Sequence, residues 1–266
     1  MKYILALSLL AGVHMAQAQT TVFSTDFDSS VAAPLNPGTA ALTGVQGFAG
    51  LGPAGHTFGG QFLRSATGNV VTLTLGNLPT HDQINLDFLF AAIDSLDGTG
   101  SFPSGDFFKI TLDGQTIFRE SFANALPSQI QSYVPPTGVE LARHVDLGFG
   151  GPGSYYTDSA YNLGADPTLQ IIAHTGAVAT FTFQVEGEGI QTLNDESWAM
   201  DRLSVSVSAV PEPEVFWLAG AGLLALWAVK LSSSRARPPR SSATAPGASC
   251  GTNRCGQCFS GRAVQA

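Results

Sequence analysis

Carboxylates beside candidate strands are the residues of this sequence best suited to a chemical role. Asp26 and Asp28 follow a first candidate strand, and Glu196 and Asp201 lie where the last candidate strand begins. The first and last strands of a β-sandwich commonly pair, so these four side chains could meet in space. Clustered carboxylate oxygens are the ligands that Ca²⁺ prefers, and the sequence therefore predicts a calcium site here.

A second group of acids lies between two apolar stretches in the middle of the chain. Asp94 and Asp97 end one stretch, Gly98 follows them, and Asp106 opens the next stretch. The spacing differs from that of an EF-hand loop, but oxygen ligands on a glycine-containing turn also suit Ca²⁺. These three aspartates are the second candidate calcium group, with solvated Asp-Gly turns as the alternative.

Aromatic residues offer a surface for sugar binding. Tyr155, Tyr156 and Tyr161 lie in a glycine-rich segment, and Trp198 is the one tryptophan between residues 20 and 209. A pyranose ring stacks on a flat aromatic face while nearby polar groups bind its hydroxyls. We therefore predict glycan stacking by these four residues. The alternatives are loop packing for the tyrosines and a core position for Trp198.

The region between residues 20 and 209 contains no recognisable catalytic motif. HExxH, a P-loop and a helix-opening GxGxxG are absent. Between residues 20 and 209, four histidines are dispersed singly and are expected in loops or edge strands: His56, His81, His144 and His174. We predict a protein without enzymatic activity, and a hydrolase that uses a dispersed pair of acids is the alternative.

The region between residues 20 and 209 has the pattern of β-structure throughout. Apolar and polar residues alternate with a period of two, and no stretch shows a sustained helical period. Candidate strands cover residues 70–75, 84–93, 107–112, 116–118, 178–186 and 203–207, and Asp113-Gly114 is a hairpin signal. About eight to ten short strands between glycine- and proline-rich loops predict an all-β fold, a single antiparallel β-sandwich of the jelly-roll type.

This region is strongly acidic. Its 18 acids and five basic residues give a formal charge of −13, whereas the whole chain carries −8. Such a charge repels nucleic acid and anionic lipid, and it suits cations or neutral ligands. The region contains no cysteine, so a buried core, aided or not by a metal ion, must hold it together.

The first 18 residues have the features of a secretory signal peptide. Lys2 provides the positive start, residues 4–13 the apolar stretch, and Ala16-Gln17-Ala18 a small-x-small cleavage site. The apolar stretch is shorter than a membrane span requires. Cleavage after Ala18 predicts a mature chain that begins outside the cytoplasm.

A second apolar segment lies near the C-terminus, between residues 215 and 231. Pro211-Glu212-Pro213 precedes it, and a basic cluster follows within residues 230–240: Lys230, Arg235, Arg237 and Arg240. With Lys230 reaching to the interface, the segment is just long enough for a helix to cross a bilayer. Acids before it and cations after it orient this helix with its N-terminus outside. Residues 241–266 are expected to form a disordered tail.

The order of these features resembles the PEP-CTERM sorting signal of Gram-negative bacteria. That signal combines a Pro-Glu-Pro motif, here Pro211, Glu212 and Pro213, with one hydrophobic helix and an arginine-rich end. The chain departs from it by continuing to Ala266. The resemblance implies an exosortase as processing partner, an inner-membrane anchor, and later transfer to the cell surface or extracellular matrix. In its family the signal accompanies exopolysaccharide production.

The start of the last candidate strand resembles the D-E-S-W-x-I-D-N ending of secreted bacterial domains that look like carbohydrate-binding modules. Asp195-Glu-Ser-Trp198 and Asp201 match, whereas Met200 and Arg202 replace the usual Ile and Asn. This resemblance implies a polysaccharide ligand and a structural Ca²⁺. We therefore expect a non-catalytic surface or biofilm-matrix protein that binds extracellular polysaccharide. A secreted hydrolase and a purely structural, self-associating matrix protein are the alternatives.

Overall fold

A computed structural model gives the fold of this chain and describes residues 19–99, 105–150, 157–188, 190–208, 220, 222–224 and 226–227. The chain divides into two compact units, Met1–Pro211 and Glu212–Ala266. Several predicted features lie outside the described residues: Ala16 and Ala18 with the rest of the signal peptide, Tyr155, Tyr156, the Pro-Glu-Pro motif, the basic cluster and the 241–266 tail.

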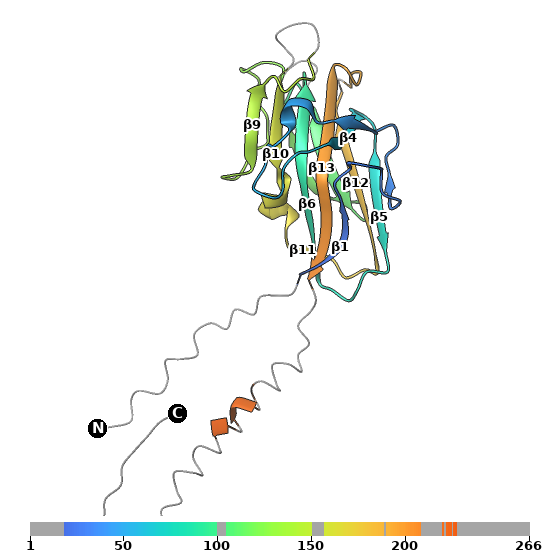
Figure 1. The fold of residues 1–266 in the computed structure, drawn as a ribbon, viewed down its shortest axis with the longest axis vertical. Helices are drawn as coiled ribbons and strands as arrows, with labels where there is room; N and C mark the ends of the chain where they lie inside the picture. Colours follow the sequence, from blue (N-terminus) through green and yellow to red (C-terminus); the bar gives the residue numbers. More distant parts are fainter. Residues whose placement is uncertain are drawn as a thin grey trace, which may run out of the picture. The chain divides into compact units, whose positions relative to one another are not determined.

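The described part of the first unit consists of strands joined by loops and three short 3₁₀ helices (Figure 1). The strands are β1 (Gln19–Thr25), β2 (Leu35–Asn36), β3 (Ala41–Gly44), β4 (Gln61–Ala66), β5 (Val71–Gly76), β6 (Gln83–Asp94), β7 (Phe107–Leu112), β8 (Gln115–Ser121), β9 (Glu140–Val145), β10 (Asp158–Asn162), β11 (Ile172–Ala173), β12 (Val178–Glu186) and β13 (Glu196–Ser208). The helices are η1 (Gln46–Phe48), η2 (Leu163–Ala165) and η3 (Pro167–Leu169). The all-β prediction is confirmed, with additional short strands in segments expected to be loops.

The strands form two antiparallel sheets. The eight-stranded sheet has the order β3-β4-β13-β6-β10-β9, with β1 beside β13 and β11 beside β6. The five-stranded sheet has the order β2-β5-β12-β7-β8. One apolar cluster joins them, with Phe90 and Trp198 from the larger sheet and Phe108 and Phe183 from the smaller. The two sheets therefore share a core as a β-sandwich does, and the jelly-roll connectivity stays a prediction.

Alternation in the sequence locates several of these strands. β5 and β12 bury every second residue, and their bounds agree closely with the expected ranges. In the β7–β8 hairpin Asp113 has φ 50° and Gly114 has φ 80°, so both central residues are left-handed, as a type I′ turn requires.

β6 has a nearly continuous apolar sequence because both of its faces are covered. Phe88 and Phe90 belong to the core between the sheets. Leu89, on the opposite face, belongs to a second apolar cluster that includes Phe48 and Phe58. The segment between β3 and β4 thus packs over the outer face of the larger sheet, which explains why β6 has the pattern of an inner strand.

β13 organises the larger sheet, and it pairs with the first strand as expected. β6 follows one of its edges throughout. Along the other edge, β4 pairs with residues 197–200 and β1 pairs with residues 203–208. The register with β6 shifts between Asp201 and Ser204, which marks a β-bulge. β4 and β1 therefore meet end to end along this edge of β13, opposite the bulge.

In the second unit the described residues 220, 222–224 and 226–227 are helical. They fall inside the apolar segment 215–231 that the sequence predicts to be a helix. Among the residues that the structure describes, no helix is both long enough and apolar enough to cross a bilayer. The membrane span stays a prediction.

Candidate metal centre

Three carboxylates from separate segments converge at one end of the sandwich. Asp97 follows β6, Asp106 precedes β7, and Glu196 is the first residue of β13. One oxygen of each lies within 4.8 Å of the other two. Oxygens bound to one Ca²⁺ at about 2.3–2.6 Å lie up to about 5 Å apart, so this spacing suits a single shared ion.

Strand pairing brings these side chains together. Glu196 lies opposite Asp94 in the β6–β13 ladder, so its carboxylate is placed where β6 ends. Asp97 forms an isolated bridge with Ala123, and its backbone N–H donates to Asp106 Oδ2 at 2.6 Å. The pairing of β6 with β13 thus adds Glu196 to the two aspartates of the β6–β7 connection.

Gly98 allows the sharp turn directly after Asp97. Its φ is 74°, and an added Cβ would lie 2.5 Å from the Ile130 carbonyl oxygen and 2.6 Å from the Ala123 Cβ. A side chain at this position would meet rigid neighbours and a backbone conformation that L-residues rarely adopt. The glycine therefore fixes the position of Asp97 relative to the other two acids.

One buried oxygen of this cluster lacks a hydrogen-bond donor among the described residues. Gln129 Nε2 donates to Asp97 Oδ1 at 2.8 Å, and Gln191 Nε2 donates to Glu196 Oε1 at 2.8 Å. Glu196 Oε2 is buried and has no hydrogen-bond partner in the described part of the chain. A buried carboxylate oxygen without a donor is costly unless a cation or a proton compensates it.

Burial raises the pKa of all three carboxyl groups. Burial, followed by the charge of Asp106, raises the pKa of Glu196 to about 8. Burial raises the pKa of Asp106 to about 6, and it raises the pKa of Asp97 as well. Near neutral pH the cluster therefore takes up positive charge readily, either as protons or as a metal ion.

The donor set indicates the class of ion. Carboxylates without thiol or imidazole ligands suit hard cations such as Ca²⁺ and Mg²⁺. Ca²⁺ accepts irregular shells of six to eight oxygens, so about three or more positions remain for backbone carbonyls and water. Three ligands carried by three separate segments fit this flexible geometry better than the strict octahedron of Mg²⁺.

The first predicted calcium group does not assemble. Glu196 and Asp201 stand five positions apart on one extended strand, which separates their Cα atoms by about 17 Å. The Asp201 carboxylate instead accepts the backbone N–H groups of Arg202 at 2.7 Å and Gly59 at 3.1 Å. Asp28 Oδ1 accepts the backbone N–H of Gln61 at 3.0 Å.

Asp26 is also used differently from the prediction. Its Oδ2 lies 4.0 Å from Arg202 Nη1, so a cationic side chain stands where the predicted ion would bind. The prediction that Asp26, Asp28, Glu196 and Asp201 share one calcium is therefore wrong, and Glu196 joins the second group instead.

Asp94, the remaining member of the second group, pairs with Arg64. Arg64 Nη2 lies 3.5 Å from Asp94 Oδ2, and burial raises the pKa of Asp94 to about 7. Its backbone N–H donates to Asp158 Oδ1 at 3.1 Å, while Leu147 donates its N–H to Asp158 Oδ2 at 2.8 Å. Asp94 lines a pocket of about 410 Å³, but Asp158 is not among its described lining residues. This pair does not present two free carboxyl groups to one cleft, as a two-acid hydrolase requires.

Two of the four predicted stacking residues are buried. Trp198 and Tyr161 are each 0% exposed. Trp198 packs against Phe108 with ring centroids 5.2 Å apart, and Tyr161 packs against Phe122 at 5.0 Å. The stacking prediction is wrong for both residues, because their strands turn these rings into the core. The alternative of a core position for Trp198 is confirmed.

Two histidines that were expected to be isolated form a buried pair. His81 Nε2 lies 2.7 Å from His174 Nδ1. His81 Nδ1 lies 2.6 Å from the Pro79 carbonyl oxygen, and His174 Nε2 lies 3.1 Å from Asp113 Oδ2. The two histidines are 93 positions apart, so no local pattern predicts their contact.

Comparison with known proteins assigns no family. No family model matches the chain, and no curated protein matches it. A family GH115 4-O-methyl-α-glucuronidase with specificity for decorated arabinogalactans is 12% identical over 69% of this chain and 18% of that one, with a TM-score of 0.28.

Two further structures show similarly weak likeness. The catalytic domain of a GH87 α-1,3-glucanase is 13% identical over 74% of this chain and 30% of its own, with a TM-score of 0.27. SGBP-B from a complex xyloglucan utilization locus of Bacteroides uniformis is 14% identical over 64% and 45%, with a TM-score of 0.25. The chain spans less than half the length of each, and likenesses of this size identify neither a fold family nor an activity.

Proposed function

We propose that this chain is an exported, non-catalytic protein of the cell surface or biofilm matrix, whose β-sandwich binds Ca²⁺ and holds extracellular polysaccharide. The observation that carries the proposal is the convergence of Asp97, Asp106 and Glu196, with the buried Glu196 Oε2 left without a partner. The acidic charge of residues 20–209 favours the approach of a cation.

The calcium ion has a structural role in this proposal. Asp106 adjoins β7 of the smaller sheet, whereas Glu196 begins β13 of the larger one. An ion bound to both therefore links the two sheets and fixes the β6–β7 connection that carries Asp97. Binding only to the folded state must stabilise that state.

Sequence patterns support the cellular setting of this proposal. The signal-peptide pattern supports export, and the resemblance to PEP-CTERM signals supports an exosortase partner, an inner-membrane anchor at residues 215–231 and later transfer to the surface. The resemblance around Trp198 supports polysaccharide as the ligand. The acidic surface argues against nucleic acid as a partner.

The first test is the thermal unfolding of residues 19–211, which lie within the compact unit Met1–Pro211, with Ca²⁺ and with chelator. We expect the midpoint to rise with Ca²⁺, by the equivalent of about 2.7 kcal/mol when Ca²⁺ is at a hundredfold excess over Kd. Mg²⁺ at the same concentration should produce a smaller shift, because its octahedral preference fits the three segments less well. The measurement is calorimetry or circular dichroism.

Matched variants locate the ion. Glu196→Gln and Asp106→Asn should abolish the calcium-dependent shift, whereas Glu140→Gln, at an exposed position of β9, should retain it. An identical midpoint with and without Ca²⁺ in the wild type would remove the metal from the proposal. A shift that survives in both cluster variants would place the ion elsewhere.

A further inference from the structure

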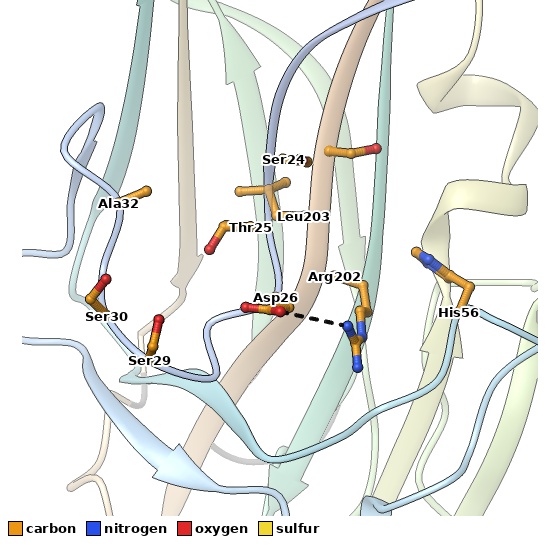
Figure 2. A pocket seen from close by; sticks show the side chains of 10 residues that line it. Ser24, Thr25, Asp26, Ser29, Ser30, Ala32, His56, Arg202 and Leu203 are labelled. Atoms are coloured by element: carbon orange, nitrogen blue, oxygen red, sulfur yellow. Dashed lines mark ion pairs between the residues drawn. The ribbon is translucent and has the colours of Figure 1, made fainter.

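A polar pocket of about 490 Å³ lies opposite the bulge of β13, where β4 ends and β1 takes over the same strand edge. Its volume is within the range of about 300–1,000 Å³ that is usual for small-molecule sites. Most of the lining residues are hydroxyl-bearing or charged, among them Ser24, Asp26, Ser29, His56, Arg202 and Ser204. Figure 2 shows them from close by.

Strained backbone on two sides holds the charged residues of this pocket in place. Arg202 lies in the bulge with φ 54°, and the fully buried Asp201 accepts its backbone N–H. On the β1 side Phe27 has φ 57°, and its fully buried side chain anchors the turn that carries Asp26. Left-handed non-glycine residues persist only where the surroundings enforce them, and they concentrate at binding sites.

The two charged groups keep bonding capacity for a ligand. Arg202 Nε donates to the Thr57 carbonyl oxygen at 3.0 Å, which fixes the guanidinium. Its Nη1 lies 4.0 Å from Asp26 Oδ2, beyond hydrogen-bond distance. Asp26 Oδ1 accepts the backbone N–H of Asp28, and Oδ2 has no hydrogen bond within the described part of the chain. The Arg202 guanidinium, a donor, and the Asp26 carboxylate, an acceptor, therefore lie close enough for one ligand hydroxyl group to hydrogen-bond to both.

Serine hydroxyls extend this arrangement. The side chains of Ser24, Ser29, Ser30 and Ser204 make no hydrogen bond to other described residues, although all four line the pocket. In the view of Figure 2, Asp26 lies between Arg202 and Ser29. The described lining contains no Trp, Tyr or Phe, so recognition here depends on hydrogen bonds and not on ring stacking.

We propose that this pocket binds one sugar unit of a neutral polysaccharide, with Arg202 donating to and Asp26 accepting from ligand hydroxyls. The inference rests on the proposed polysaccharide function and names the site and ligand class for it. A neutral ligand fits because Asp26 balances Arg202, and His56 Nε2 lies 3.2 Å from Asp87 Oδ1, so the pocket has no free excess of cations. The acidic charge around it disfavours an anionic glycan.

The test is calorimetric titration of the full chain, with Ca²⁺ present, using cello-, laminari-, malto-, manno- and xylohexaose and the anionic hexagalacturonate. Arg202→Gly removes the guanidinium and keeps a residue suited to the left-handed backbone. Asp26→Asn changes the acceptor at an exposed position. Arg119→Gln, on β8 of the smaller sheet, is the control. A cooperative thermal unfolding transition, followed by circular dichroism, verifies that each variant folds.

We expect at least one neutral hexasaccharide to bind the wild type. Its affinity should be at least tenfold lower for each of the two pocket variants, and it should be unchanged for Arg119→Gln. Binding that persists in both pocket variants overturns the pocket and leaves the polysaccharide function intact. Binding of hexagalacturonate alone overturns the neutral ligand class. Binding of no glycan overturns both the pocket and the polysaccharide function, while the calcium shift judges the metal centre separately.

Discussion

At the scale of residues, the metal centre predicts a pH dependence that depends on calcium. Burial raises the pKa of Glu196 from 4.5 to about 8, so in chelator the folded state keeps a proton that the unfolded chain has lost. The stability that this proton provides is fully present below about pH 4.5 and is lost as pH rises through about 8. The ionisation of Glu196 alone should lower the free energy of unfolding by up to about 1.4 kcal/mol per pH unit in this window. Chemical denaturation at several pH values measures it.

The comparison with Glu196→Gln isolates this contribution. The variant should lose part of the slope between pH 5 and 8, since Asp94 and Asp106 also have raised pKa values and continue to contribute. Saturating Ca²⁺ should make the wild-type slope less steep, because the ion replaces the proton on Glu196, while Asp94, outside the cluster, still contributes. Parallel pH profiles of the wild type and the variant in chelator would contradict the assigned ionisation of Glu196.

The residues of the site were only partly predictable. Asp97 and Asp106 were found because a turn with acids and glycine is a local pattern. Glu196 was assigned to the wrong partners, because its position depends on the register of β13 against β6. The sequence does not predict the His81–His174 pair, because each histidine by itself stands in a turn-rich segment and their contact joins positions far apart in the chain.

At the scale of elements, the turn after β6 should be intolerant of a side chain. Gly98→Ala places a Cβ 2.5 Å from the Ile130 carbonyl oxygen in a residue with φ 74°. We expect the free energy of unfolding to fall by about 2–4 kcal/mol, from left-handed strain and overpacking together. The calcium-dependent shift should also weaken, because Asp97 moves. Denaturant titration with and without Ca²⁺ measures both effects.

Gly44→Ala is the matched control for this turn. Gly44 ends β3, is exposed, and has no atom within 4 Å of an added Cβ. Its substitution should change stability by less than about 1 kcal/mol, because alanine costs less chain entropy than glycine and meets no obstacle. Equal losses of stability in the two variants would contradict the strain and overpacking at Gly98, and an unchanged calcium-dependent shift in Gly98→Ala would show that Asp97 does not move.

The strands differ in how far the sequence reveals them. β5, β7 and β12 were predicted from their composition or alternation, and β6 from its long apolar run. β10 was missed because all five of its residues are buried, among them Asp158 and Asn162, and such a segment shows no alternation. The long loop predicted before β4 covers the second apolar cluster and contains short strands, which only tertiary packing defines.

At the scale of the whole molecule, the pairing of β1 with β13 joins the first and the last strand of the folded domain. Thr21 lies opposite Ser206 in this ladder, and facing Cα atoms of antiparallel strands are about 4.5–5.5 Å apart, within disulfide range. The double variant Thr21→Cys with Ser206→Cys should form a disulfide that raises the free energy of unfolding by about 4–5 kcal/mol, because it closes nearly the whole domain. Unfolding of residues 19–211 under oxidising conditions measures it.

The reduced form of the same variant is the control. It should unfold at nearly the wild-type denaturant concentration, because Thr21 is exposed and Ser206 is only partly buried. Residues 19–211 contain no native cysteine, so no other disulfide competes. Failure of the two thiols to join under oxidising conditions would contradict the observed register.

The same antiparallel ladder determines how the domain would respond to mechanical force. Gln19, the first residue of β1, faces Ser208, the last residue of β13. A force that pulls on these two residues therefore acts at one end of the ladder. Such a force would break the hydrogen bonds of the β1–β13 ladder one pair after another, instead of shearing all of them at once. The domain should open first at β1, which lines the polar pocket. The metal centre, at the Glu196 end of β13, should still be intact at that stage. Tension on the two ends would thus release a bound sugar before it unfolds the sandwich.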